Sequence, residues 1–134
     1  MFNKILVAYD GTPSAESAFE QAARLARAER QALHVVAVAW TPEVETRVAM
    51  DMQAKEFKAL LEQLRSRESN MDLDLRTEVA EGNPHEQIVR VAKRLDADLL
   101  VIGHRRRGLM QRLAETSVAK RVIDRAHCPV MVAN

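Results

Sequence analysis

The sequence predicts an α/β protein built on a mostly parallel sheet. Three apolar runs rich in β-branched residues carry almost no polar side chain: Ile5–Ala8, Leu33–Trp40 and Leu99–Ile102. Such runs suit strands that are buried on both faces, as in a parallel sheet covered by helices. Segments with apolar residues at helical spacing alternate with strands, in the order β-α-β-α-β-α-β-α-β. No linker divides the chain, so we expect one domain spanning residues 1–134.

Two further strands complete the predicted set of five. Residues 72–79 alternate apolar or threonine side chains, such as Leu73 and Val79, with charged ones. This alternation indicates an edge strand that is half exposed. Residues 129–133 begin with Pro129, which is acceptable at the first residue of a strand or at a sheet edge.

Four helices are expected between these strands. The first has Thr12 as its N-cap and Pro13 at its first helical position. The third has Asn83 as a capping residue, followed by Pro84, with Glu86 three residues after the cap. The apolar positions of the four helices are, in chain order, Ala15, Ala18, Phe19, Ala22, Ala23 and Ala26; Phe57, Leu60, Leu61 and Leu64; Ile88, Val91, Ala92 and Leu95; and Ala119, Val122, Ile123 and Ala126.

Composition excludes several classes of function. Apolar residues make up 47% and charged residues 29%, and the net charge of +1 gives no reason to expect a nucleic-acid or membrane partner. The single Cys128 cannot form an internal disulfide, and no Cys/His spacing resembles a zinc site, which favours a reducing compartment. We find no signal peptide and no run of the roughly 18 apolar residues that a membrane helix needs. We therefore expect a cytoplasmic protein.

The loops after the strands are the places where a ligand is expected. In an open parallel sheet, ligands bind at the carboxyl ends of the strands, where the strand order reverses. The loop after the fourth strand holds Gly103, Gly108 and the arginines 105–107, a combination that favours an anion such as phosphate. Its glycine spacing matches neither a P-loop nor a dinucleotide fingerprint. An exposed, solvated arginine surface is the alternative.

Two polar residues near these loops allow two interpretations each. Asp10, at the end of the first buried strand, either accepts hydrogen bonds from a ribose or adenine amino group or ties the Gly11–Thr12 turn together. Ser117 is a phosphate ligand, the N-cap of the last helix, or both. No nucleophile, base and orienting acid are assembled in the sequence, so we do not expect a conventional enzyme.

From end to end, the chain resembles the universal stress protein family. The resemblance lies in five segments: Lys4–Thr12, Leu33–Val38, Glu81–Pro84, Ala97–Gly103 and His127–Val132. In that order, they are similar to the family's first strand with its aspartate turn, its second strand, the end of its third strand, its fourth strand and its last strand. The resemblance implies a Rossmann-like or flavodoxin-like sandwich: a five-stranded parallel sheet in the order 3-2-1-4-5 between four helices. It also implies a homodimer formed through the last strand, at Val130, Met131 and Val132.

The resemblance also implies a nucleotide site. Family members that bind ATP share a pattern after the fourth strand: Gly, two residues, Gly, nine residues, Gly, then Ser or Thr. Gly103 and Ser117 match it, whereas Arg106 and Thr116 stand where the other two glycines are expected. A side chain at Arg106 obstructs close approach of the backbone to phosphate, and Thr116 resists a positive φ. Arg105 and its neighbours offer charged contacts instead. The site residues implied are Ala8, Asp10, Thr12, Val38, Gly103, Arg105, Arg106, Gly108, Thr116, Ser117 and Val118.

Two hypotheses of function follow. In the first, the chain is a small dimeric regulatory or protective protein of the stress response that acts through protein partners, without conventional ATP binding. In the second, it is a sensor that binds ATP or AMP, with Mg²⁺ and at most slow hydrolysis, and changes its partner according to the bound ligand.

Overall fold

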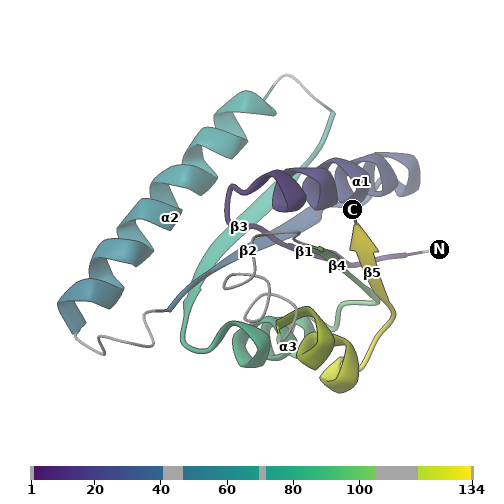
Figure 1. The fold of residues 1–134 in the computed structure, drawn as a ribbon. Helices are drawn as coiled ribbons and strands as arrows, with labels where there is room; N and C mark the ends of the chain where they lie inside the picture. The colour runs from purple at the N-terminus through teal and green to yellow at the C-terminus, as the bar shows by residue number, and fades with distance from the viewer. Residues whose placement is uncertain (1, 41–46, 70–71, 105–117, 134) are drawn as a thin grey trace.

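The computed structural model describes residues 2–40, 47–69, 72–104 and 118–133, and it forms an α/β sandwich (Figure 1). In chain order the elements are β1 (Ile5–Ala8), α1 (Pro13–Glu29), β2 (Leu33–Ala39), α2 (Arg47–Arg67), β3 (Leu75–Glu81), α3 (Pro84–Leu95), β4 (Leu99–Gly103) and β5 (Val130–Ala133). Residues 118–125 form a further helix. None of the helices seen in these residues is long and apolar enough to cross a membrane.

The five strands form one parallel sheet in the order β3-β2-β1-β4-β5, which confirms the predicted order. The central strand β1 is short. Its pairing with β2 ends at Ala8↔Val36, and its pairing with β4 ends at Val7↔Val101. Both neighbours continue beyond these pairs, β2 to Ala39 and β4 to Gly103. The carboxyl end of the sheet therefore has a gap in its middle.

Helices cover both faces of the sheet, which explains why β1, β2 and β4 are almost entirely apolar. On one face lie α1 and α2 (Figure 1), and the core beneath them includes Ile5 and Val101. On the other, α3 and the helix at residues 118–125 pack against Leu6, Val36 and Leu100. Each of these five strand residues is at most 1% exposed, as expected for a parallel sheet that is buried on both faces.

Two predicted strands start later than expected. We expected the third strand at 72–79, but β3 runs from Leu75 to Glu81, because its pairing with β2 begins only at Leu33↔Leu75. The last strand begins at Val130, one residue after Pro129, which has no N–H to donate to the ladder. The second strand ends at Ala39, one residue earlier than predicted.

The two predicted helix starts differ in their capping. Thr12 caps α1 as predicted: its Oγ1 accepts a hydrogen bond from the Ala15 N–H at 3.4 Å, and Pro13 follows it. Asn83 occupies the N-cap position of α3, but its side chain forms no capping hydrogen bond, so that part of the prediction is wrong. The Asn83 carbonyl accepts the Gln87 N–H instead, at 3.0 Å.

Gly103 lies where the end of β4 touches the first turn of α1. A Cβ atom at this position would lie 2.5 Å from the Ser14 carbonyl oxygen and 2.7 Å from its carbon. These are backbone atoms, so no rotation of a side chain can relieve the contact. Gly103 therefore has a packing role, which is separate from the phosphate-binding role implied by the sequence.

We expect the substitution Gly103→Ala to lower the free energy of unfolding by about 1–3 kcal/mol, because it overpacks a contact between two backbones. Urea denaturation measures the change. Ala28→Gln, at an exposed position of α1, serves as the control and should change stability by less than about 0.5 kcal/mol. An unaltered midpoint for Gly103→Ala would contradict the close approach of β4 to α1.

Candidate functional site

A cavity of about 390 Å³ opens at the carboxyl ends of β1, β2 and β4. Apolar side chains form most of its wall, and Asp10, Thr12, Ser14 and Gln53 add polar groups. The residues that line it are Ala8, Tyr9, Asp10, Thr12, Ser14, Ala15, Val36, Val38, Trp40, Gln53, Phe57, Pro84, Ile88, Ile102, Gly103, Val118 and Ala119. The cavity thus occupies the place where the short central strand leaves its neighbours, which is the usual ligand position in such sheets.

The backbone of Val38 forms one edge of this cavity. The Tyr9 N–H donates to the Val36 carbonyl at 2.9 Å, so Val36 faces β1, and the Gly82 N–H donates to the Ala39 carbonyl at 3.0 Å, so Ala39 faces β3. In a parallel ladder, successive residues of a strand face opposite neighbours. The N–H and C=O of Val38 therefore face the side of β1, beyond the last paired residue of that strand. They offer a donor and an acceptor side by side to a flat ring.

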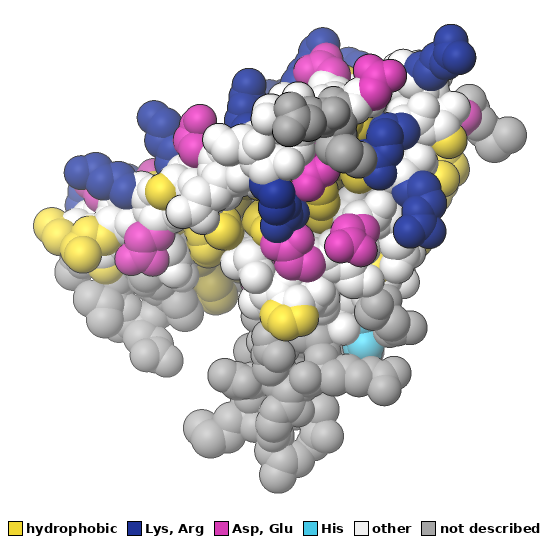
Figure 2. Space-filling model, turned by 90° about the horizontal axis from the view of Figure 1, so that it is seen from above, with side chains coloured by type: hydrophobic (Ala, Val, Ile, Leu, Met, Phe, Trp, Pro, Cys, Tyr) yellow, Lys and Arg dark blue, Asp and Glu magenta, His cyan; other side chains and the backbone are white. Residues whose placement is uncertain are grey.

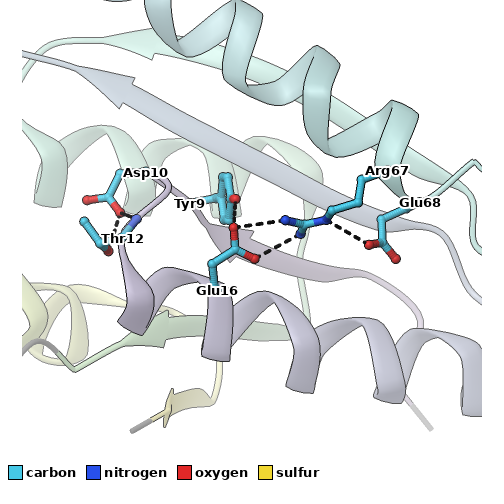
Figure 3. A network of polar contacts seen from close by, with 6 residues as sticks. All are labelled: Tyr9, Asp10, Thr12, Glu16, Arg67 and Glu68. Atoms are coloured by element: carbon cyan, nitrogen blue, oxygen red, sulfur yellow. Dashed lines mark hydrogen bonds and ion pairs between the residues drawn. The ribbon is translucent and has the colours of Figure 1, made fainter.

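Asp10 holds the turn between β1 and α1. Its Oδ1 accepts hydrogen bonds from the Thr12 N–H at 3.1 Å and from the Thr12 Oγ1 at 2.6 Å (Figure 3). Gly11 between them has φ +82°, a conformation that side-chain-bearing residues rarely adopt. The second of the two interpretations, that Asp10 ties the turn together, is confirmed. The same carboxylate also lines the cavity, so the ligand-binding role stays a prediction.

Trp40 and Gln53 connect the end of β2 to helix α2. The Trp40 N–H donates a hydrogen bond to the Gln53 Oε1, and both residues line the cavity. We expected a ligand at the loops that follow the strands, but the residues singled out for it did not include Gln53. No local signal marks Gln53, because its position depends on how α2 packs on the sheet.

A polar network lies beside the cavity, between α1 and the end of α2. The Tyr9 hydroxyl donates to Glu16 Oε2, and Arg67 donates to both oxygens of Glu16, with Nη2–Oε1 at 2.9 Å and Nη1–Oε2 at 3.2 Å (Figure 3). The Arg67 guanidinium also lies 5.9 Å from the centre of the Phe19 ring, and Tyr9 meets that ring edge-on at 6.0 Å. Basic and acidic side chains are interspersed over this face of the molecule (Figure 2).

The network shifts the acidity of its members in opposite directions. Burial, followed by the hydrogen bond and charge of Glu16, raises the pKa of Tyr9 from 10.0 to about 12. Burial alone would raise the pKa of Glu16, but the hydrogen bonds from Arg67 and Tyr9 outweigh it and lower that pKa. Tyr9 is therefore a neutral hydrogen-bond donor and Glu16 a carboxylate at neutral pH, and together with Arg67 they tie β1, α1 and α2 to one another.

The structure brings together the predicted site residues that it describes. Ala8, Asp10, Thr12, Val38, Gly103 and Val118 all line the cavity. Arg105, Arg106, Gly108, Thr116 and Ser117 lie outside the described residues. Binding by any of these residues stays a prediction.

Comparison with known proteins identifies the family of this chain and agrees with its fold. A family model described as the universal stress protein family matches residues 1–134. The chain belongs to the universal stress protein family. A universal stress protein of Methanocaldococcus jannaschii is 30% identical over 139 residues, which cover 98% of this chain and 82% of that protein.

Solved structures of the family have the same architecture. The universal stress protein UspA from Lactobacillus plantarum superposes with a TM-score of 0.85 at 27% identity, covering 98% of this chain and 97% of that one. A universal stress protein from Archaeoglobus fulgidus, solved in complex with dAMP, superposes with a TM-score of 0.73 at 25% identity and 98% coverage of both chains.

The pKa of Tyr9 can be measured directly, because it is the only tyrosine in the chain. The folded protein retains the phenol proton that the unfolded chain loses, so this contribution to stability is complete below pH 10 and disappears as the pH rises toward 12. Glu16→Gln removes the acceptor charge, so we expect phenolate absorbance to appear at lower pH in this variant while circular dichroism still reports a folded chain. Glu20→Gln, at an exposed position one turn later, is the control. Identical titrations of Glu16→Gln and the unaltered protein would exclude the contact.

Proposed function

We propose that this chain is a regulatory protein of the stress response that binds an adenine mononucleotide in the cavity at the carboxyl end of its sheet. The observation that carries the proposal is the gap beyond β1, where the backbone of Val38 faces a mostly apolar cavity with Asp10 at its margin. The proposal assigns the cavity a binding role and no chemical step.

Adenine suits the edge formed by Val38. On its Watson–Crick edge, adenine presents a ring-nitrogen acceptor beside an amino donor, which matches a backbone N–H beside a C=O. A purine ring is also largely apolar on its faces, and Trp40, Phe57, Ile88 and Ile102 supply apolar wall on several sides of the cavity. We assign the base to this part of the cavity.

Asp10 suits the sugar. Its carboxylate is held by Thr12 at the end of β1, between the base position and the first turn of α1. A carboxylate held in place is a strong acceptor for ribose hydroxyls, because hydrogen bonds to charged groups are stronger than neutral ones. The sugar therefore lies on the side of α1 in this proposal.

A mononucleotide fits the sequence better than a triphosphate. Arg106 and Thr116 replace two of the glycines that accompany ATP binding in the family, whereas the residues assigned to the base and sugar are in place. The Archaeoglobus fulgidus relative was solved with dAMP, a mononucleotide. If ATP binds, its phosphate oxygens are the ligands we assign to Mg²⁺, which prefers oxygen ligands and retained waters.

Trp40 makes the proposal measurable, because it is the only tryptophan in the chain and it lines the cavity. We expect AMP to change its fluorescence with an affinity in the micromolar range, and ATP to bind no more tightly than AMP. Asp10→Asn should weaken AMP binding about tenfold, since it replaces a charged acceptor worth roughly 1.5–3 kcal/mol by a neutral one worth roughly 0.5–1.5 kcal/mol.

Asp74→Asn is the matched control for this titration. Asp74 is exposed just before β3, at the opposite end of the sheet, where it pairs with Arg76, so this variant should bind AMP as the unaltered protein does. Absence of any signal and of any heat of binding at millimolar AMP and ATP would exclude nucleotide binding. That result would favour the other hypothesis, a regulatory protein that acts through protein partners alone.

We also propose that the protein forms a homodimer through β5. This strand ends the sheet order and pairs with β4 on one side. Val132 is 38% exposed although it is a large apolar residue within the strand. An edge strand with apolar residues is a surface that a second copy can cover.

Val132→Lys should convert the dimer to a monomer, because it places a charge in the proposed interface. Light scattering coupled to size-exclusion chromatography measures the mass directly. Val48→Lys, at another exposed valine on α2, should leave the mass unchanged. A monomeric unaltered protein, or a dimer that survives Val132→Lys, would rule out this interface.

A further inference from the structure

We propose that Gln53 contacts the base of the bound nucleotide, donating a hydrogen bond from its Nε2 to a ring nitrogen. This inference rests on the proposed nucleotide site and names a residue of α2 as part of it. Its role is to select a purine over a pyrimidine, because it presents a donor at a place where the base must present a ring-nitrogen acceptor.

The position of Gln53 follows from the ladder of β2. Val36 faces β1, and alternation places the backbone groups of Val38 and Trp40 on that same side. The paired residues of β1 end at Ala8↔Val36, and the Tyr9 N–H adds one more hydrogen bond, to the Val36 carbonyl. The Trp40 N–H donates instead to the Gln53 Oε1. The Gln53 side chain therefore extends from α2 to the side of β2 that the Val38 backbone faces. A longer β1 would occupy this position.

The orientation of the Gln53 amide follows from the same contact. Trp40 offers a backbone N–H, so the amide must turn its oxygen toward it, since a flipped amide would set donor against donor. The oxygen is then engaged, and the Nε2 group, with two N–H donors, is the part of the amide that can serve a ligand. Because Gln53 lines the cavity and its oxygen already accepts the Trp40 N–H, we assign the Nε2 group as the donor toward a ligand there.

A donor at this place has two possible targets on adenine. The N–H of Val38 is assigned to the ring nitrogen on the Watson–Crick edge, next to the amino group. The remaining ring acceptors are N3 and N7, which face the minor and major grooves in a duplex. Gln53 Nε2 therefore donates to one of these two nitrogens.

The substitution Gln53→Glu separates base contact from support of the backbone. A glutamate keeps an oxygen that can accept the Trp40 N–H, but its second oxygen is an acceptor that repels a ring nitrogen. A residue that only supports Trp40 would tolerate this change. A residue that contacts the base would not.

The experiment titrates AMP, 3-deaza-AMP and 7-deaza-AMP into the unaltered protein and into Gln53→Glu, followed by Trp40 fluorescence and calorimetry. We expect one of the two analogues to bind the unaltered protein about tenfold more weakly than AMP, which corresponds to one lost hydrogen bond. Gln53→Glu should bind AMP more weakly and should lose that discrimination. All three ligands carry the same phosphate, so their ratio is insensitive to the added negative charge.

Gln63→Glu is the matched control, because it adds the same charge at an exposed position of the same helix. It should retain the discrimination between AMP and its analogue. Unchanged discrimination in Gln53→Glu, or equal binding of all three ligands to the unaltered protein, would overturn the role of Gln53 while leaving the nucleotide site intact. Failure of the unaltered protein to bind AMP at all would overturn both.

Discussion

The short central strand β1 is the constraint on which the rest of the structure depends. A strand flanked on both sides normally satisfies the backbone groups of both neighbours along its length. Here β1 stops at Ala8, and β2 and β4 continue past it. Backbone groups of β2 therefore face a space that another strand does not fill. The cavity, the fixed amide of Gln53 and the turn at Asp10 are all located around that space.

The elements β4, α1 and α2 surround this space, and contacts among them hold them in place. Gly103 lets the end of β4 approach the first turn of α1. Glu16, in the first turn of α1, pairs with Arg67 at the far end of α2 and accepts a hydrogen bond from Tyr9, just after β1. The walls of the cavity are thus fixed by packing and by a shared ion pair. A preformed site of this kind spends little of its binding free energy on ordering the protein.

The sequence predicted those features that arise from local signals. Ile5–Ala8 is apolar on both faces because helices cover both sides of the sheet. Thr12 and Pro13 mark the start of α1, and this signal does not depend on how the helix packs. The order of the strands came from family resemblance and not from the spacing of residues. The start of β3 was misplaced because its register depends on its pairing with Leu33, which the alternation of its own residues does not encode.

The contacts that complete the site were not predictable, since each joins residues far apart in the chain. Arg67 and Glu16 are 51 positions apart, and nothing near either residue identifies its partner. Gln53 is one of several polar residues on α2, and only the packing of that helix places it against Trp40. The aspartate at the end of the first strand was recognised, because its place after an apolar run and before Gly11 is a local signal.

A crystal structure of the chain grown with AMP would test most directly whether the gap beyond β1 is a nucleotide site. The prediction is an adenine ring within hydrogen-bond distance of the Val38 N–H and C=O, with the sugar beside Asp10 and Gln53 directed at a ring nitrogen. AMP bound elsewhere on the protein, or a base in the cavity that contacts neither Val38 nor Gln53, would contradict this account.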